Sequence, residues 1–350
     1  MKDPKEIAAA FAIEGNIKDV KPLGNGLIND TFRVYTDGPK DYVLQRINTA
    51  IFKDVELLQH NIECATAHIR RKGGMTLTLV PCKATGKTFW TDGETHWRVS
   101  EFIDNAYTYD TVNPEYSYYA GKAFGAFEAM LADIPDTLGE TIPDFHNMEL
   151  RARQLREAVQ ADAVGRMAEP EVQAILKDLQ VYEEEMCKAE RLFREGKLPK
   201  RICHCDTKVN NMLFDAKGNI LCVIDLDTLM PSFVFSDFGD FLRTAANTVA
   251  EDDPAVEKVD FRMDIFEAFA KGYLEGATFL TPVEKDNLPY AACLFPYMQA
   301  VRFFADYING DTYYKIRYPE HNLVRTRNQV ALFHAAYDKQ AAMKAYIDSL

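Results

Sequence analysis

The sequence predicts an α+β protein with a small β-rich N-terminal domain and a larger, mainly helical C-terminal domain. Short β-prone runs separated by turn residues fill most of the first 104 residues. Long stretches with helical spacing of apolar residues fill most of the remaining chain. Only three short β-prone segments interrupt these helical stretches, so we expect one domain over residues 1–104 and a second over residues 105–350.

The N-terminal domain combines strands with two helices. A short amphipathic helix is expected over residues 5–13. Apolar residues in steps of three and four predict a long helix over residues 54–72, and Gly73 ends it. Turn residues bound the β-prone runs, which predict antiparallel strands over 20–23, 31–36, 41–47, 78–82, 88–90 and 97–102.

Helical patterns dominate the C-terminal domain. They predict helices over 114–133, 147–165, 170–195, 260–275 and 283–309. The interrupting β-prone segments are 201–203, 211–215 and 220–225. A small sheet-rich domain followed by a larger helical one is a layout that suits an enzyme with a cleft.

Composition and charge narrow the class of partner. The 350 residues include 40 Lys and Arg against 53 Asp and Glu, a formal net charge of −13. A surface of this sign repels nucleic acid phosphates and anionic lipid headgroups, so we expect neither nucleic acid nor a membrane as partner. No run approaches the roughly 18 apolar residues of a membrane-spanning helix. We therefore expect a cytoplasmic protein, a monomer or weak dimer, that acts on a small molecule.

Seven scattered cysteines are typical of reduced intracellular thiols. The run Cys203-His204-Cys205 contains residue types that bind zinc, but no second Cys/His pair follows at zinc-finger spacing. Alternation along a strand also points Cys203 and Cys205 to one side and His204 to the other. We therefore do not expect a zinc site in this run.

A polar segment between two β-prone runs has the spacing His-x-Asp-x-x-x-x-Asn, with Asp206 and Asn211 as its last two members. Asp225 and Asp227 end a later apolar run. Phosphoryl transfer needs one carboxylate to orient the acceptor hydroxyl and separate oxygen ligands to hold Mg²⁺. Asp206 can meet the first requirement, and Asn211 with Asp225 the second. Alternatively, Asp206 and Asn211 serve loop hydrogen bonds, because both residue types are common in turns.

A glycine-rich segment near the N-terminus lies between two predicted strands. It includes Gly24, Asn25 and Gly26. Because a strand and not a helix follows, neither a Rossmann nor a P-loop site is predicted. A β-hairpin whose glycines let backbone N–H groups approach a nucleotide triphosphate is one interpretation, and a simple β-turn is the other.

Together these segments resemble the aminoglycoside phosphotransferase and choline kinase family, which has a protein-kinase-like two-lobe fold. Within it, the chain is similar to the bacterial N-acetylhexosamine 1-kinases. The resemblance covers nearly the whole chain. It is carried by the glycine-rich segment, by residues 42–48, 97–99, 224–228, 237–240 and 318–327, and by the Asp206 segment.

The resemblance implies a role for each candidate residue. Asp206 would be the catalytic base toward a sugar hydroxyl, and Lys208 would steady the transferred phosphate unless it is a surface lysine. Asn211 and Asp225 would bind Mg²⁺, and Asp227 could approach a second metal ion. The remaining assignments are Gly24, Asn25, Gly26, Arg46, Glu63, Glu101 and Ile103 for ATP, and Arg302, Tyr318, Leu27 and Asp206 for the sugar.

Two departures from the family pattern limit this transfer. The usual strand lysine that holds the α and β phosphates has no counterpart, because Gln45 and Arg46 occupy its neighbourhood. Arg46 is our candidate for the missing charge. Leu27 stands where the sugar kinases have a histidine, so a polar contact to the sugar is lost and sugar preference could shift.

Three further expectations concern charged residues outside the motif. Arg302 lies in an apolar helix and should meet either Asp306 or a ligand. Asp237 and Asp240 are expected to bond the backbone of the Asp206 loop. The cationic group of His321, Arg325 and Arg327 either closes the sugar site or braces two helices, and bracing is favoured.

The sequence thus predicts a kinase that uses ATP and Mg²⁺ to phosphorylate the anomeric hydroxyl of an N-acetylhexosamine. One alternative is a kinase for another hydroxylated acceptor, such as an aminoglycoside, choline or homoserine. Another is a nucleotide-binding protein without catalytic activity, which the missing strand lysine keeps open.

Overall fold

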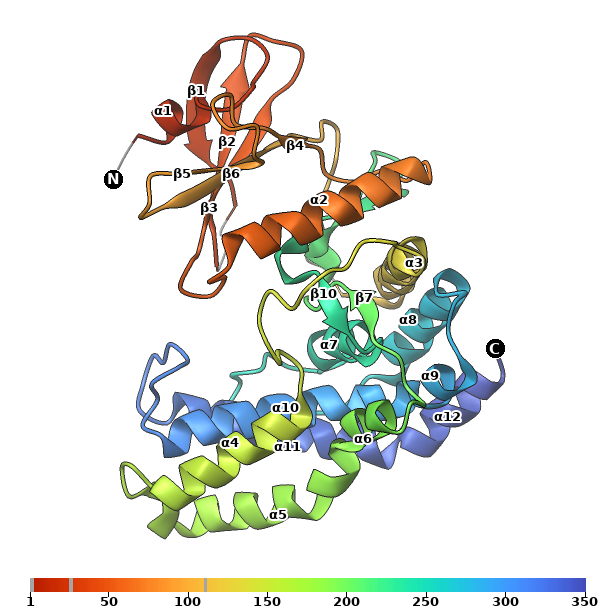
Figure 1. Ribbon diagram of the computed structural model, residues 1–350. Coiled ribbons are helices and arrows are strands. Elements are labelled where there is room, and N and C mark those ends of the chain that lie inside the picture. The colour runs from red at the N-terminus through yellow and green to blue at the C-terminus, as the bar shows by residue number, and fades with distance from the viewer. Residues whose placement is uncertain (1–2, 25–27, 110–111) are drawn as a thin grey trace. The chain divides into compact units, whose positions relative to one another are not determined.

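The computed structural model describes residues 3–24, 28–109 and 112–350 (Figure 1). The chain forms two compact units. Unit 1 contains Met1–Tyr109, Asp133–Pro143 and Asn210–Met230, and unit 2 contains Asp110–Ala132, Asp144–Val209 and Pro231–Leu350. The first unit therefore extends past residue 104 and includes two later segments of the chain.

Unit 1 is built around an antiparallel sheet, as the sequence predicts. Its six strands follow the order β1-β2-β3-β6-β4, with β5 also paired to β6. A separate hairpin pairs β8 with β9. The elements are α1 (Pro4–Ala8), β1 (Ile17–Pro22), β2 (Asp30–Thr36), β3 (Tyr42–Ile47), α2 (Val55–Arg71), β4 (Leu79–Val80), β5 (Phe89–Thr91), β6 (His96–Glu101), β8 (Met212–Phe214) and β9 (Ile220–Val223).

Strand alternation gives the two faces of this sheet different surroundings. On β3 and β6, Leu44, Trp97 and Val99 join a buried apolar cluster with Ile7 and Phe11 of the N-terminal segment. Residues at the intervening positions of the same strands point to the opposite face. The register pairs Gln45 with Arg98 and Val43 with Ser100, so these side chains share that second face.

Helix α2 begins and ends where the sequence predicts. The Asp54 side chain accepts a hydrogen bond from the Leu57 N–H at 2.9 Å and caps the first turn. Gly73, with φ +80°, provides the left-handed residue that follows many helices. The apolar face buries Leu58, Ile62 and Ile69.

Unit 2 is mainly helical, as predicted. Its elements are α3 (Pro114–Leu131), α4 (Met148–Ala161), α5 (Pro170–Met186), α6 (Lys188–Arg194), β7 (Arg201–Cys203), α7 (Phe235–Ala245), α8 (Met263–Gly276), α9 (Pro282–Asp286), α10 (Leu288–Ile308), α11 (His321–Asp338) and α12 (Gln340–Asp348), and β10 (Met230–Ser232) pairs with β7. The helices expected over 170–195 and 283–309 are each divided in two. The sequence did not predict α7, α11, α12 or β10.

Glycines allow α3 and α8 to pack closely within unit 2. A Cβ atom on Gly121 would lie 2.1 Å from the Phe269 carbonyl oxygen, and one on Gly272 would lie 2.1 Å from the Tyr118 carbonyl oxygen. Such contacts are far below van der Waals separation, so only glycine permits this backbone approach.

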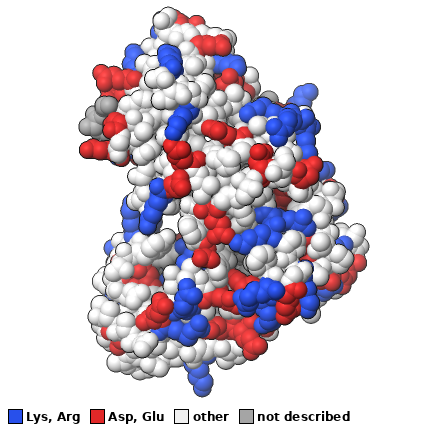
Figure 2. Space-filling view, in the orientation of Figure 1, with Lys and Arg blue, Asp and Glu red and all other residues white. Residues whose placement is uncertain are grey.

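No helix in the described part of the chain is long and apolar enough to cross a membrane. On the visible face of unit 2, Lys and Arg side chains are interspersed with Asp and Glu side chains (Figure 2).

The α3–α8 packing predicts that Gly272→Ala destabilises the protein. Alanine would ordinarily improve helix propensity by about 1 kcal/mol. Overpacking against the Tyr118 carbonyl should outweigh that gain and lower the free energy of unfolding by about 1–3 kcal/mol. Urea denaturation measures the change, with the exposed Lys271→Ala on the same helix as control. An equally stable Gly272→Ala protein would contradict this packing.

Candidate active site

Unit 1 contains a cavity of about 460 Å³ against the second face of its sheet. Val43 and Gln45 of β3 and Arg98 and Ser100 of β6 contribute one wall. Further lining residues come from distant parts of the sequence, namely Gly24, Ile62, residues 101–103, Asn211, Leu213 and 224–226. The cavity is thus lined by the outward-alternating side chains of β3 and β6 on one side and by residues of and around the β8–β9 hairpin on another.

Two predicted metal ligands, Asn211 and Asp225, line this cavity. The Ile224 N–H donates to the Asn211 carbonyl at 2.9 Å, which holds the two flanking segments together. Asp225 has φ +61°, in the left-handed region that aspartate tolerates better than most residues. Amide and carboxylate oxygens are the ligands that Mg²⁺ prefers, so this pair fits that ion chemically.

Arg98 is a lining residue that sequence reasoning did not assign to the site. It is 5% exposed, and its Nε and Nη2 donate to Gln45 Oε1 at 2.9 and 2.8 Å. Its Nη1 forms an ion pair with Asp227 Oδ1. The signal in the sequence was its position between Trp97 and Val99, whose apolar side chains point to the other face.

Asp227 is 4% exposed and does not line the cavity. Besides the ion pair with Arg98, its carboxylate accepts a hydrogen bond from the Asn29 amide. Its carbonyl oxygen accepts from Thr141 Oγ1 at 3.1 Å. The carboxylate is thus occupied by protein groups, so its position gives no support to the second-metal role expected for it.

Arg46 and Glu63 also lie away from the cavity lining. Arg46 is two residues after Leu44 on β3, so its side chain lies on the first face of the sheet. It forms an ion pair with Asp30 at 3.5 Å. Glu63 is exposed and accepts a hydrogen bond from Thr88. The positions of both side chains lend no support to their predicted contacts with ATP.

The segment that contains Glu101 and Ile103, both predicted to contact ATP, is held by two backbone hydrogen bonds. The Glu101 N–H donates to Thr78 O and the Phe102 N–H donates to Asp41 O, both at 2.9 Å. Glu101 and Ile103 line the cavity, as does Gly24. Asn25, Gly26 and Leu27 lie outside the described residues, so their predicted roles are untested.

In unit 2, carboxylates from α7 hold the Asp206 loop, as predicted. Asp237 accepts from the His204 N–H at 2.8 Å and the Cys205 N–H at 2.7 Å. Asp240 accepts from the Thr207 N–H at 3.1 Å. These bonds satisfy backbone donors that the loop would otherwise bury unpaired. Lys208 Nζ lies 2.7 Å from Asp206 Oδ1.

The carboxylates beneath this loop have raised pKa values. Burial raises the pKa of Asp237, and the pKa of the buried Glu128 is raised by its own burial and by Asp237. Oxygen atoms of Glu128 and Asp237 and the sulfur of Cys203 lie within 4.8 Å of one another. Asp237 already accepts two N–H groups and Glu128 accepts from Tyr273, so we assign the group to structure.

Arg302 makes no ion pair with any described residue. Its nearest partners are Gln299 Oε1 at 3.3 Å and the rings of Phe145 and Tyr314. Asp306, the alternative partner, instead accepts hydrogen bonds from backbone N–H groups of residues 312–314 and from the Asn322 side chain. The remaining expectation for Arg302 is a ligand.

Other cations lie near Arg302. Burial and the positive charges of Arg302, Arg151 and Arg243 lower the pKa of His146. Burial, with a contribution from Arg302, lowers the pKa of Arg151 to about 10. Arg243 Nε also lies 3.7 Å from Asp240, which links this cationic cluster to the Asp206 loop.

The C-terminal cluster braces helices in part: Arg327 joins α11 to α5, whereas His321 contacts a residue in a turn. His321 is buried against Asp252, with Nε2 to Oδ2 at 3.3 Å, and Arg327 pairs with Glu171 of α5. Tyr318, a predicted sugar contact, is 40% exposed and packs on the His321 ring.

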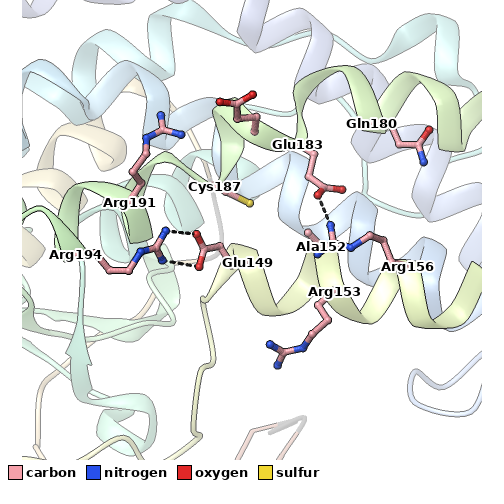
Figure 3. Close-up of a pocket in the computed structure, with 10 residues that line it drawn as sticks. Glu149, Ala152, Arg153, Arg156, Gln180, Glu183, Cys187, Arg191 and Arg194 are labelled. Carbon is pink, nitrogen blue, oxygen red and sulfur yellow. Dashed lines mark hydrogen bonds and ion pairs between the residues drawn. The ribbon is translucent and has the colours of Figure 1, made fainter.

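A larger hollow of about 720 Å³ lies among α4, α5 and α6. Figure 3 shows its charged groups facing one another: Arg194 forms two bonds of 2.7 Å with Glu149, and Arg156 pairs with Glu183. Burial raises the pKa of the adjacent Cys187 thiol to about 12, so the thiol stays protonated and unreactive. The residues that line this hollow are not among those predicted for the site.

The loop carboxylates predict a pH dependence of stability. Burial raises the pKa of Asp240 to about 6, whereas an unfolded aspartate titrates near 4. Ionising Asp240 in the folded protein therefore costs stability, and that cost grows as the pH rises from about 4 to about 6. The side chain of Asp240→Asn can still accept a hydrogen bond from the Thr207 N–H. The free energy of unfolding of this variant should rise by up to about 3 kcal/mol relative to wild type as the pH increases across this range.

Urea denaturation at a series of pH values measures the Asp240 effect. The exposed Glu157→Gln in the same unit is the control and should follow wild type. A wild-type and Asp240→Asn stability difference that is constant from pH 4 to pH 6.5 would contradict the raised pKa.

The fold has known relatives among solved structures. It is similar to an aminoglycoside phosphotransferase from Alicyclobacillus acidocaldarius, with 12% identity, a TM-score of 0.67 and coverage of 100% of this chain and 98% of that one. It is also similar to an amicoumacin kinase bound to AMP-PNP and Ca²⁺, with 14% identity, a TM-score of 0.59 and coverage of 93% of this chain and 91% of that one. A choline kinase from Streptococcus pneumoniae matches with 14% identity, a TM-score of 0.51 and coverage of 93% and 94%.

These similarities confirm the predicted kinase-like α+β fold, with a small antiparallel sheet and a larger helical part. Residues 19–282, about three quarters of the chain, also match the phosphotransferase enzyme family. The match includes the Gly24 segment, Arg98, the Asp206 loop, Asn211 and Asp225. The chain therefore belongs to the phosphotransferase enzyme family.

Proposed function

We propose that the chain is a kinase that transfers the γ-phosphoryl group of ATP, with Mg²⁺, to a small hydroxylated molecule. The observation that supports this most is the lining of one cavity by Gly24, the 101–103 segment, Asn211 and Asp225. The amicoumacin kinase of similar fold was solved with an ATP analogue and a divalent cation.

Asn211 and Asp225 would hold Mg²⁺ through their side-chain oxygens. When bound, the ion would offset negative charge on the transferred phosphoryl group. The backbone of Glu101–Ile103 would meet the adenine, and the Gly24 segment would approach the phosphates through N–H groups. Asn25 and Gly26 belong to this proposal as predicted members of that segment.

Asp206 would orient the acceptor hydroxyl and accept its proton. Phosphoryl transfer depends mainly on positioning, because the transition state is loose and little covalent chemistry falls to the protein. The hydrogen bonds from the backbone of the loop to Asp237 and Asp240 would supply that positioning. Lys208, already 2.7 Å from Asp206, would exchange this contact for one to the transferred phosphate.

For the acceptor, we propose an N-acetylhexosamine phosphorylated at its anomeric hydroxyl. Arg302 lacks an ion pair within the described residues and lies beside aromatic rings, surroundings that suit a neutral sugar with a carbonyl acceptor. The neighbouring Arg151 adds positive charge, whereas Arg243 is paired with Glu251 and lies near Asp240. Leu27 and Tyr318 stay as predicted contributors to sugar preference.

A cationic acceptor is the second candidate, because two relatives of similar fold are an aminoglycoside phosphotransferase and a choline kinase. Arg302 and Arg151 near His146 disfavour it, since like charges repel at close range. A nucleotide-binding protein without catalytic activity is the remaining alternative.

A substrate panel tests the proposal. The purified protein is incubated with ATP and Mg²⁺ and with single acceptors: N-acetylglucosamine, N-acetylgalactosamine, glucose, choline, homoserine and an aminoglycoside. ³¹P NMR locates the product phosphate. We expect an anomeric phosphate on an N-acetylhexosamine. Phosphorylation of choline or the aminoglycoside alone would replace the sugar assignment, and no product from any acceptor would favour the inactive alternative.

Asp206→Asn should lower kcat with the best acceptor by about 10²–10⁴-fold, because asparagine cannot accept the hydroxyl proton. The melting temperature should change little, since the hydrogen bonds that hold the loop come from its backbone. Steady-state kinetics and thermal denaturation measure both. Normal turnover in this variant would remove Asp206 from its proposed role.

A further inference from the structure

The cavity of unit 1 would receive a polyanion, yet its lining contains few cations. Among the described lining residues, Arg98 is the cationic one. Kinase-like enzymes usually place a lysine on the third strand for the nucleotide phosphates and hold it with a glutamate from the following helix. Here the residues of β3 and α2 that line the cavity are Val43, Gln45 and Ile62, and none of them is charged.

Arg98 occupies the ladder position directly across from Gln45. The two residues are register partners on β6 and β3, and both face the cavity. Gln45 Oε1 accepts from Nε and Nη2 of Arg98 at 2.9 and 2.8 Å, which fixes the plane of the guanidinium. A guanidinium has five N–H donors, so Gln45 and Asp227 together leave donors for a ligand.

Asp227 supplies the carboxylate that a helix glutamate would otherwise provide. Its ion pair with Arg98 is shielded from water, with the two residues 5% and 4% exposed. The Asn29 amide holds the same carboxylate from the other side. This arrangement neutralises Arg98 when no anion is bound and keeps its guanidinium at the cavity wall.

We infer that Arg98 is the cation that binds the nucleotide phosphates and that Asp227 is its positioning counter-ion. The cation thus lies on β6 in place of the third strand, and its carboxylate partner lies in the segment after Asp225 in place of the helix. This inference rests on the proposed function and replaces Arg46 as the candidate phosphate cation, because Arg46 follows the other face of β3.

Equilibrium binding of ADP and of adenosine, measured by calorimetry without any acceptor, tests this inference. Arg98→Gln should weaken ADP binding by about tenfold to a hundredfold, the effect of a lost charge-assisted hydrogen bond. Adenosine has no phosphates, so its binding should be unchanged. The double variant Gln45→Lys/Arg98→Gln places a cation on β3, directly across from the lost arginine. It should recover most of the ADP affinity.

Unfolding of the single variant is a risk, because Arg98→Gln leaves Asp227 as an unpaired buried charge. The double variant Arg98→Gln/Asp227→Asn removes both charges, should stay folded by thermal denaturation, and should show the same selective loss of ADP binding. Lys87→Gln, an exposed cation of the same unit paired with Glu56, is the matched control and should bind ADP like wild type.

The outcomes separate the two proposals. Unchanged ADP binding in the Arg98 variants, or an equal loss of ADP and adenosine binding, would overturn the role of Arg98. A loss of ADP binding in Arg46→Gln with none in the Arg98 variants would assign the phosphates to Arg46. Failure of the wild-type protein to bind ADP would instead reject the nucleotide-dependent function and this inference with it.

Discussion

A buried charge must find a partner of opposite sign, and in unit 1 that requirement joins Arg98 to Asp227. Removing one member of such a pair typically costs about 3–5 kcal/mol, because the other charge is left without water or a counter-ion. Asp227 also accepts from Asn29 and, through its backbone, from Thr141. The pair therefore fixes the segment that carries Asp225 against the sheet, so the proposed metal ligands depend on it.

In unit 2, the requirement that buried polar groups form hydrogen bonds likewise fixes the Asp206 loop. Asp237 and Asp240 lie on α7 and accept three backbone N–H groups of residues 204–207. Burial raises the pKa of both carboxyl groups, so keeping them ionised beneath the loop costs the protein some stability. A loop fixed in this way suits a reaction in which orientation of the hydroxyl supplies much of the rate.

Most of the fold could be predicted because its strands and amphipathic helices have clear periodicity. Helix α11 was missed because it buries polar residues, including Asn322, Thr326 and Gln329, which hide its inner face from a hydrophobic pattern. Asn211 and Asp225, chosen for their side-chain oxygens, both line the cavity of unit 1, and their binding of Mg²⁺ stays a prediction. Alternation with Trp97 and Val99 indicates the face on which Arg98 lies, but its pairing with Gln45 could not be predicted, because the two strands are about 50 residues apart in the sequence. Arg46 was chosen by proximity to the expected lysine, without regard to strand alternation.

The most direct measurement is a crystal structure of the protein with AMP-PNP and Mg²⁺. We expect triphosphate density at the wall formed by Gln45 and Arg98, metal density beside the oxygens of Asn211 and Asp225, and an intact ion pair between Arg98 and Asp227. A nucleotide bound outside this cavity, phosphates on Arg46, or a metal ion held by Asp227 would contradict it.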